Sequence, residues 1–430
     1  MVERTFNRIR KEIAISQAAY SPGRSTTELV CAFKILTEKA ICSQDLEVHL
    51  LMLDMSRAFD TIERGTLLKD LSEILEPDEL HLVSLLLTDV QLQVKHDKII
   101  GETFTPDIGS PQGDCASPIW FIFYFHKALL GYKTESARDI TLDIAHDHPY
   151  IKNEFKRGDE RRIEPPKSQN NFCIAQQYAD DTSWITTEKH IKDNIKSKVP
   201  PVLKARNLLV NEDKTEEYTV SREGDTEWKK CRFLGSLLGN EEDIKRRKQL
   251  ACAAFHKNKT SLCSNKISLK TRIRIFSALI KPIALYNSEL WTLNSKDTKK
   301  IDTFQRAFLR QIVRCKRISN ARLYELCKLV PWSKDVKKRR LNWYGHMIRL
   351  PTDAPVKQAL HEATAKKVKN PSGGQRTTWL KTVKKDFKGF ELETGQVIKD
   401  LTIVNELALD RHIYAQLVES VMERSPANKC

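Results

Sequence analysis

The chain has 430 residues, of which 40% are hydrophobic and 30% are charged, and its formal net charge is +16. This length and composition allow two or three domains with a sizeable core and exclude wholesale disorder. No apolar run approaches the roughly 18 to 20 residues that span a bilayer, and the charged start lacks the apolar stretch of a signal peptide. We therefore expect an intracellular protein of the nucleus or cytoplasm that is neither secreted nor bound to a membrane.

The first 240 residues alternate between short apolar runs and segments with helical spacing. Apolar residues repeat with a period close to 3.6 in Thr27–Ala40, which predicts a helix, whereas Val48–Leu53 predicts a buried strand that ends at Asp54. Residues 132–170 are polar and predict an inserted surface segment. The other elements expected here are helices over Arg64–Leu75, Leu80–Leu87, Ile119–Leu130 and Lys189–Leu203, a strand over Leu92–Ile100, a hairpin over Phe172–Thr186, a short strand over Leu208–Val210 and a strand pair over Cys231–Leu238.

The excess of positive charge lies in one segment. Residues 241–350 contain 27 Lys and Arg against 8 Asp and Glu, a net charge of +19, and the other 320 residues carry −3. This asymmetry indicates a polyanionic partner, although a solvated basic helical surface accounts for it equally well. The pattern from residue 241 onward is helical, and a polar linker (352–376) precedes a smaller helical tail. Strands and helices followed by a basic helical segment predict an α+β fold with a helical appendage.

Acidic residues occur at two predicted strand ends. Asp54 follows the strand Val48–Leu53, and Asp180 and Asp181 lie at the tip of the hairpin Phe172–Thr186. Carboxylates gathered from these places would supply the hard oxygen ligands that suit Mg²⁺, and two such ions support in-line phosphoryl transfer. The alternative is structural, because Asp-Asp is a good turn pair and single Asp residues cap helices.

Five ordered segments resemble palm motifs A to E of the reverse transcriptases of non-LTR (LINE-like) retrotransposons. They are Leu51–Asp60, Gly109–Pro118, Tyr178–Asp181, Leu208–Glu216 and Phe233–Ser236. Gln17–Thr27 is similar to a fingers motif of this family, and residues 340–347 and 374–380 resemble segments downstream of the polymerase. The resemblance implies a right-hand polymerase, with truncated fingers (1–47), a palm (48–240), a basic helical thumb or connection (241–350) and a linker with a helical tail (351–430).

The resemblance also implies an activity and its participants. The chain would be an RNA-directed DNA polymerase that adds dNMP to a primer 3′-hydroxyl, with an RNA template, a DNA primer and dNTP as partners. Two Mg²⁺ ions, with Mn²⁺ as the alternative, would be held by Asp54, Asp180 and Asp181. Lys214 would protonate the pyrophosphate leaving group or offset its charge, although it is one of many lysines in the chain.

The resemblance assigns further residues to substrate binding. Phe59 would exclude a ribose 2′-hydroxyl, unless it is an ordinary core residue, and Gln112 and Gly113 would approach the incoming nucleotide. Arg24 would contact template or triphosphate, unless it is a solvated loop residue. The primer grip would consist of Phe233, Leu234 and Gly235.

The sequence departs from the family in having only 53 residues before Asp54, with no upstream endonuclease domain and no Cys/His knuckle. We therefore expect the polymerase portion of a larger element protein, whose activity in isolation is open. One alternative is a non-catalytic nucleic-acid-binding derivative of such an element. Another is an RNA-dependent RNA polymerase, against which Phe59 argues.

Overall fold

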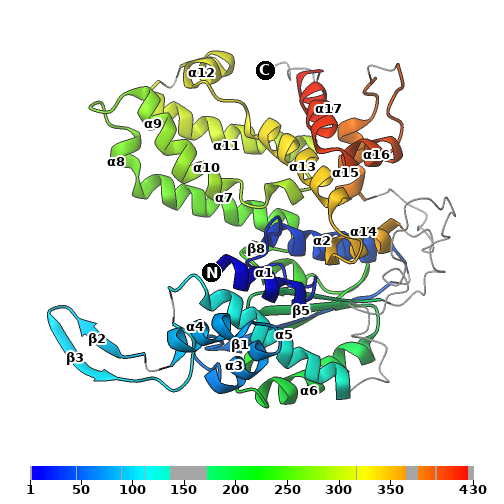
Figure 1. Cartoon of the computed structure of the whole chain (residues 1–430). Helices are drawn as coiled ribbons and strands as arrows, with labels where there is room; N and C mark the ends of the chain where they lie inside the picture. Colours follow the sequence, from blue (N-terminus) through cyan, green and yellow to red (C-terminus); the bar gives the residue numbers. More distant parts are fainter. Residues whose placement is uncertain are drawn as a thin grey trace. The chain divides into compact units, whose positions relative to one another are not determined.

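The computed structural model describes residues 2–44, 46–88, 90–111, 113–135, 172–315, 317–364, 376–392 and 395–424. The chain forms two compact units (Figure 1). The first comprises Met1–Leu29, Ser43–Gly224 and Asp353–Lys369, and the second comprises Val30–Cys42, Asp225–Thr352 and Asn370–Cys430. Each unit has a hydrophobic cluster of its own. The division into fingers, palm, thumb and tail stays a prediction.

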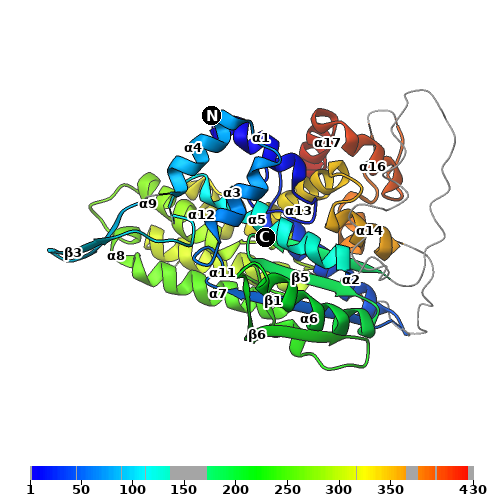
Figure 2. The same cartoon turned by 60° about the horizontal axis from the view of Figure 1, so that its bottom comes forward.

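The first unit is built on a four-stranded antiparallel sheet with the strand order β4-β5-β1-β6. Figure 2 shows β5, β1 and β6 of this sheet side by side. Its strands are β1 (Val48–Ser56), β4 (Cys173–Tyr178), β5 (Asp181–Thr186) and β6 (Leu209–Val220). Strands β4 and β5 form a tight hairpin in which Tyr178 is opposite Asp181, and Leu53 of β1 is opposite Thr182 of β5. The predicted hairpin is therefore confirmed. The predicted strand at Val48–Leu53 is also present, but it continues to Ser56, so Asp54 lies within the strand and not after it.

Helices pack around this sheet. They are α1 (Val2–Glu12), α3 (Arg64–Ser72), α4 (Pro77–Leu87), α5 (Ser117–Glu135), α6 (Lys189–Lys204) and α14 (Pro355–Thr364), and α2 (Thr26–Cys42) begins in this unit and continues in the second. The segment Trp120–Phe125 of α5 is at most 2% exposed at every residue, as expected for a helix that is apolar on all sides. Helix α5 therefore forms the centre of the first core, as its apolar sequence predicts.

Three predicted elements need correction. The single strand expected over Leu92–Ile100 is a hairpin, β2 (Leu92–His96) and β3 (Ile99–Phe104), which turns at Asp97 with a φ of +52°. This ribbon is exposed along its whole length and extends away from α3 and α4 (Figure 1). Strand β6 has twelve residues where three were expected, and α14 lies inside the predicted linker 352–376. The expected inserted segment lies largely outside the described residues.

The second unit is helical, with a two-stranded ribbon. The ribbon is β7 (Arg232–Phe233) and β8 (Ser236–Leu237), next to a 3-10 helix, η2 (Glu227–Lys230). The helices that follow are α7 (Asn240–Lys257), α8 (Lys259–Leu262), α9 (Leu269–Ile275), the π-helix η3 (Phe276–Ile280), α10 (Lys281–Ala284), the 3-10 helix η4 (Ser288–Leu290), α11 (Ser295–Val313), α12 (Asn320–Cys327), α13 (Trp332–Arg349), α15 (Trp379–Phe387), α16 (Thr402–Leu409) and α17 (Arg411–Arg424).

Aromatic residues hold the helices of this unit together. The rings of Phe255 on α7 and Phe308 on α11 are stacked at 4.5 Å, and Phe276 stacks on Trp332 of α13 at 5.9 Å.

The sheet and helices of the first unit and the helices of the second unit confirm the predicted α+β fold with a basic helical segment. No helix among the described residues is both long and apolar enough to cross a membrane.

Candidate active site

The three carboxylates singled out from the sequence lie on neighbouring strands of the first unit. Asp54 is on β1, and Asp180 and Asp181 lie at the tip of the β4–β5 hairpin, whose strand β5 pairs with β1. Desolvation raises the pKa of Asp181 to about 6, and the charges of Asp180 and Asp54 add to this rise. Desolvation and the charge of Asp54 also raise the pKa of Asp180. Asp54 is therefore near enough for its charge to disfavour the ionisation of both hairpin carboxylates.

A lysine offsets part of this negative charge. The ammonium Nζ of Lys214 lies 3.4 Å from Oδ2 of Asp54. The pairing of β1 with β6 shifts here, because Met52 is opposite Glu216 whereas Asp54 is opposite Asn211. Such bulges redirect side chains, and this one brings Lys214 to Asp54. The bulge could not be predicted from the sequence, because only a short strand over Leu208–Val210 was expected here.

The described residues contain no group of three or more His, Cys, Asp or Glu side chains that could hold a metal ion in this arrangement. The chemistry of the donor set nevertheless suits one, because Asp54, Asp180 and Asp181 present hard carboxylate oxygens from adjoining strands. The raised pKa values of Asp180 and Asp181 fit the same donor set, because a bound cation would favour the ionised form of both groups.

The turn between Tyr178 and Asp181 has an unusual backbone conformation. Ala179 has a φ of +56°, a region that favours glycine. The side-chain amide of Gln17 hydrogen-bonds both backbone groups of Ala179, at 3.2 Å to its carbonyl and 3.0 Å from its N–H. The half-exposed Tyr20 lies near this turn. Desolvation, and then the charges of Tyr178 and Asp180, raise the pKa of its hydroxyl. Sequence reasoning placed Gln17 in a motif but gave it no role.

The loop after β1 is joined to the segment before α5. The backbone N–H of Ser110 donates to the carbonyl of Phe59 at 2.9 Å, and Gly109 donates to Ile62 at 2.8 Å. Gly109 has a φ of +84°, and a Cβ added there would lie 3.0 Å from the carbonyl oxygen of Asp60. Only glycine allows this close approach. The ring of Phe59 is half-buried and packs on Phe121 of α5 at 4.3 Å.

Arg64 at the start of α3 holds this loop in place. Its buried guanidinium donates to the carbonyl oxygens of Gly109 at 2.8 Å, Leu87 at 2.7 Å and Pro106 at 2.6 Å. Desolvation lowers the pKa of Arg64, and the three carbonyl groups compensate the buried charge. This role could not be predicted from the sequence, because no local pattern distinguishes a buried arginine at a helix start from an exposed one.

The other residues predicted to bind substrate are Gln112, Gly113 and Arg24. Gly113 has a φ of +96°, and an added Cβ would meet no atom within 4 Å. Gln112 lies outside the described residues. Arg24 is not a solvated loop residue, because its side chain is 8% exposed and donates to Glu28 at 2.5 and 2.6 Å and to the carbonyl of Ile15 at 2.9 Å. Its guanidinium is thus bound within the first unit.

The predicted primer grip is a tight turn of the second unit. Leu234 and Gly235 join β7 to β8 with φ values of +45° and +82°, as in a type I′ hairpin. The hydroxyl of Tyr286 donates to the carbonyl of Leu234 at 3.0 Å, and the guanidinium groups of Arg246 and Arg247 donate to the carbonyl of Gly235. The carbonyl groups of the turn are therefore fixed by three side chains. The ring of Phe233 contacts Phe33 at 4.6 Å.

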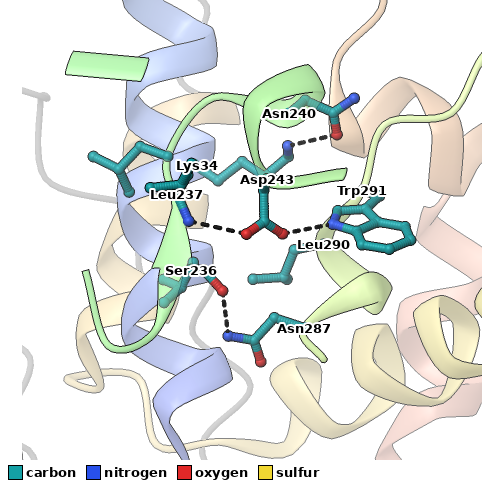
Figure 3. Close-up of a pocket in the computed structure, with 10 residues that line it drawn as sticks. Lys34, Ser236, Leu237, Asn240, Asp243, Asn287, Leu290 and Trp291 are labelled. Atoms are coloured by element: carbon teal, nitrogen blue, oxygen red, sulfur yellow. Dashed lines mark hydrogen bonds between the residues drawn. The ribbon is translucent and has the colours of Figure 1, made fainter. Parts of the chain in front are cut away.

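A small cavity lies behind this turn (Figure 3). Asp243 accepts hydrogen bonds there from the backbone N–H of Leu237 at 3.0 Å and from the indole of Trp291 at 2.9 Å. The cavity holds about 20 Å³, room for about one water molecule and far below a nucleotide pocket. We therefore assign it a structural role.

Part of the basic surface of the second unit is formed by α7 to α9 and the loops between them. Exposed lysine and arginine side chains follow one another along these helices. They are Lys245, Lys257, Lys259, Lys266, Lys270 and Arg274. Three tryptophans in this part of the sequence, Trp291, Trp332 and Trp343, are not part of this surface, because they are at most 8% exposed. Positive charge, without stacking tryptophans, is what these helices present to solvent.

Comparisons with known proteins identify the family to which the chain belongs. Residues 1–238 match the model of the family "Reverse transcriptase (RNA-dependent DNA polymerase)". An uncharacterized transposon-derived protein of Caenorhabditis elegans is 30% identical over 117 residues, which are 25% of this chain and 40% of that protein. The chain thus spans well under two thirds of this relative's length.

Solved telomerase structures are similar at low identity. Telomerase of Candida tropicalis in complex with a fragment of telomeric RNA is 14% identical with a TM-score of 0.38, over 84% of this chain and 56% of that one. The corresponding complex from Candida albicans is 13% identical with a TM-score of 0.36, over 83% and 55% of the two chains. The family match covers more than half of the 430 residues and contains the strands that carry the three aspartates. The chain belongs to the reverse transcriptase family.

Proposed function

We propose that this chain is the polymerase portion of a non-LTR retrotransposon protein and synthesises DNA on an RNA template. The observation that carries the proposal is the placement of Asp54 beside the hairpin tip that bears Asp180 and Asp181, where burial and neighbouring charge raise the pKa values of both hairpin carboxylates. Perturbed carboxylates gathered at a strand end are typical of functional sites. Members of the reverse transcriptase family use divalent metal ions.

In this proposal Asp54, Asp180 and Asp181 bind two Mg²⁺ ions, with Mn²⁺ as the alternative. When bound, the ions activate the primer hydroxyl and offset charge on the phosphates. If an ion were bound, Asp54 would hold it beside Lys214, whose Nζ lies 3.4 Å from Oδ2 of this carboxylate. The exposed ammonium of Lys214 is proposed to act on the pyrophosphate leaving group, either as a proton donor or as a compensating charge.

Substrate selection is proposed for the loops that meet at Phe59. Because the carbonyl of Phe59 accepts from Ser110 and its ring packs on Phe121, the side chain has a fixed position from which to exclude a 2′-hydroxyl. Gln112 and Gly113 follow this junction and are proposed to contact the incoming dNTP. A contact of Arg24 with template or triphosphate also stays a proposal, and it would compete with the ion pair to Glu28.

The template and primer are proposed to bind the second unit as well. The exposed lysines of α7 to α9 suit the phosphate backbone of a duplex, whose binding is electrostatic and falls with salt. The turn Phe233–Gly235 is proposed to hold the primer end. Its carbonyl groups are already bound by Tyr286, Arg246 and Arg247, so it is preorganised for this role.

Primer extension tests the proposal. The purified chain is given poly-rA annealed to oligo-dT, with Mg²⁺ and either dTTP or UTP, and its binding to the same duplex is measured over a range of salt concentrations. We expect extension with dTTP, little with UTP, and binding that weakens as salt rises. Binding without extension would instead identify a non-catalytic nucleic-acid-binding derivative, and a preference for UTP would identify an RNA polymerase.

A further inference from the structure

The segment that follows α1 is attached to the edge of the sheet that ends in the candidate active site. Strand β4 is an edge strand, and residue 17 forms a parallel bridge with residue 177. The N–H of Ala18 donates to the carbonyl of Gln177 at 2.9 Å, and the N–H of Gln177 donates to the carbonyl of Ser16 at 2.9 Å. This segment therefore covers the open edge of β4 immediately before Asp180.

The side chain of Gln17 extends this attachment by one step, to the turn itself. It is 2% exposed, and its amide donates to the carbonyl of Ala179 and accepts from the N–H of the same residue. The same oxygen also accepts from the N–H of Ala19 at 3.0 Å. One side chain thus binds both backbone polar groups of the residue directly before Asp180.

The conformation of Ala179 explains why such a contact is needed. A non-glycine residue is sterically disfavoured in the left-handed region, and such conformations persist only where the surrounding structure enforces them. Ala179 is 7% exposed, so without this contact its backbone groups would be buried without partners, which destabilises the fold. An amide satisfies both groups at once, because it carries a donor and an acceptor side by side.

We propose that Gln17 is a positioning residue, which fixes the turn at Ala179 and thereby the directions in which Asp180 and Asp181 project. The inference rests on the proposed function, since it gives the positions of these carboxylates a catalytic meaning. It adds a contribution of the amino-terminal segment to the active site that acts through the backbone, without any contact between Gln17 and substrate.

The chain offers a matched control in the second unit. Gln305 is 1% exposed and makes the same number of hydrogen bonds, donating to the carbonyl of Val330 at 3.0 Å and accepting from the N–H of Trp332 at 2.8 Å and the hydroxyl of Tyr324 at 3.1 Å. Gln305→Met therefore removes an equivalent buried amide that lies in a different unit from the three aspartates. Its effect measures lost stability alone.

The test compares the kinetics of dTTP incorporation by Gln17→Met, Gln305→Met and the double variant Gln17→Met/Ala179→Gly. We expect Gln17→Met to lower kcat at least about 10-fold with KM for dTTP changed less than about 3-fold, since a group that acts only in the transition state behaves in this way. Glycine at 179 should restore at least about 5-fold of kcat, because it adopts the left-handed conformation without assistance. Gln17→Asn, whose amide is one methylene too short to reach, should behave like Gln17→Met.

Equal losses of kcat in Gln17→Met and Gln305→Met, or no recovery with glycine, would overturn the inference. If the parent chain does not extend a primer, the proposed function fails for this chain, and hydrogen exchange of the Ala179 amide provides a separate test. Gln17→Met should then accelerate this exchange at least about 10-fold while Gln305→Met leaves it unchanged. Unchanged exchange in Gln17→Met would equally overturn the inference.

Discussion

The ammonium of Lys214 lies 3.4 Å from the carboxylate of Asp54, and a bulge in β6 brings the two together. The side chain of Lys214 is 68% exposed, so the ion pair contributes little to folding. Lys214 therefore lies beside the candidate metal-binding carboxylates, and it could take part in catalysis without being needed for the stability of the fold.

Replacing this lysine should therefore impair catalysis and spare stability. We expect Lys214→Ala to lower kcat for nucleotide addition about 100-fold, as loss of a general acid does, with the free energy of unfolding changed by less than about 0.5 kcal/mol. The control is Lys196→Ala, which removes another exposed lysine, paired to Glu217 at 2.8 Å. Single-turnover extension and urea unfolding measure both effects, and equal activity of the two variants would rule out this role.

Phe59 should control the choice of sugar. Its backbone is fixed by Ser110 and its ring by Phe121, so truncation opens space where a 2′-hydroxyl would lie. We expect Phe59→Ala to raise the ratio of UTP to dTTP incorporation at least about 10-fold. Leu68→Ala, which removes another side chain packed on the same core, should lower stability without changing this ratio. An unchanged ratio in Phe59→Ala would assign Phe59 to the core alone.

Arg64 should be among the stabilising residues of the first unit. Replacement by Met leaves three carbonyl groups without their donor, so we expect the free energy of unfolding to fall by about 3 kcal/mol. Denaturant titration measures the loss, and Arg322→Met provides the comparison, because its exposed ion pair with Glu325 should contribute less than about 1 kcal/mol. Similar losses in the two variants would contradict the role of Arg64 in holding the loop.

Glu217 links β6 to α6 and predicts a pH dependence. Hydrogen bonds from Lys192 and then Lys196 lower its pKa from 4.5 to about 2. Because the folded protein binds this proton less readily, the contribution to stability is present above about pH 4.5 and is lost as the pH falls to about 2. The carboxylate is 39% exposed, so after solvent screening we expect about 1 kcal/mol.

Glu217→Gln should remove this contribution. The difference in unfolding free energy between parent and variant should be about 1 kcal/mol at pH 6 and should shrink toward zero near pH 2, as followed by urea titration. A difference that stays constant with pH would mean that the carboxylate has an ordinary pKa.

The sequence predicted the strand before Asp54, the hairpin with Asp180 and Asp181, and most helices, because these depend on local apolar patterns. It missed what depends on contacts between distant segments. The attachment of Gln17 to Ala179 joins residues 162 positions apart. The hairpin at Asp97 is exposed on both faces, so its sequence lacks the alternation of apolar and polar residues that a buried face would require. The bulge beside Asp54 and the burial of Arg64 likewise arise only when separate segments meet.

If the carboxylates at the hairpin tip carry out nucleotide addition, Asp180→Asn should abolish it. The measurement is single-turnover extension of oligo-dT on poly-rA with dTTP and Mg²⁺, beside Asp193→Asn, which alters an exposed aspartate of α6. With binding to the duplex retained in both variants, we predict extension by the parent and by Asp193→Asn, and none by Asp180→Asn. Extension by Asp180→Asn at the rate of the parent would contradict the account.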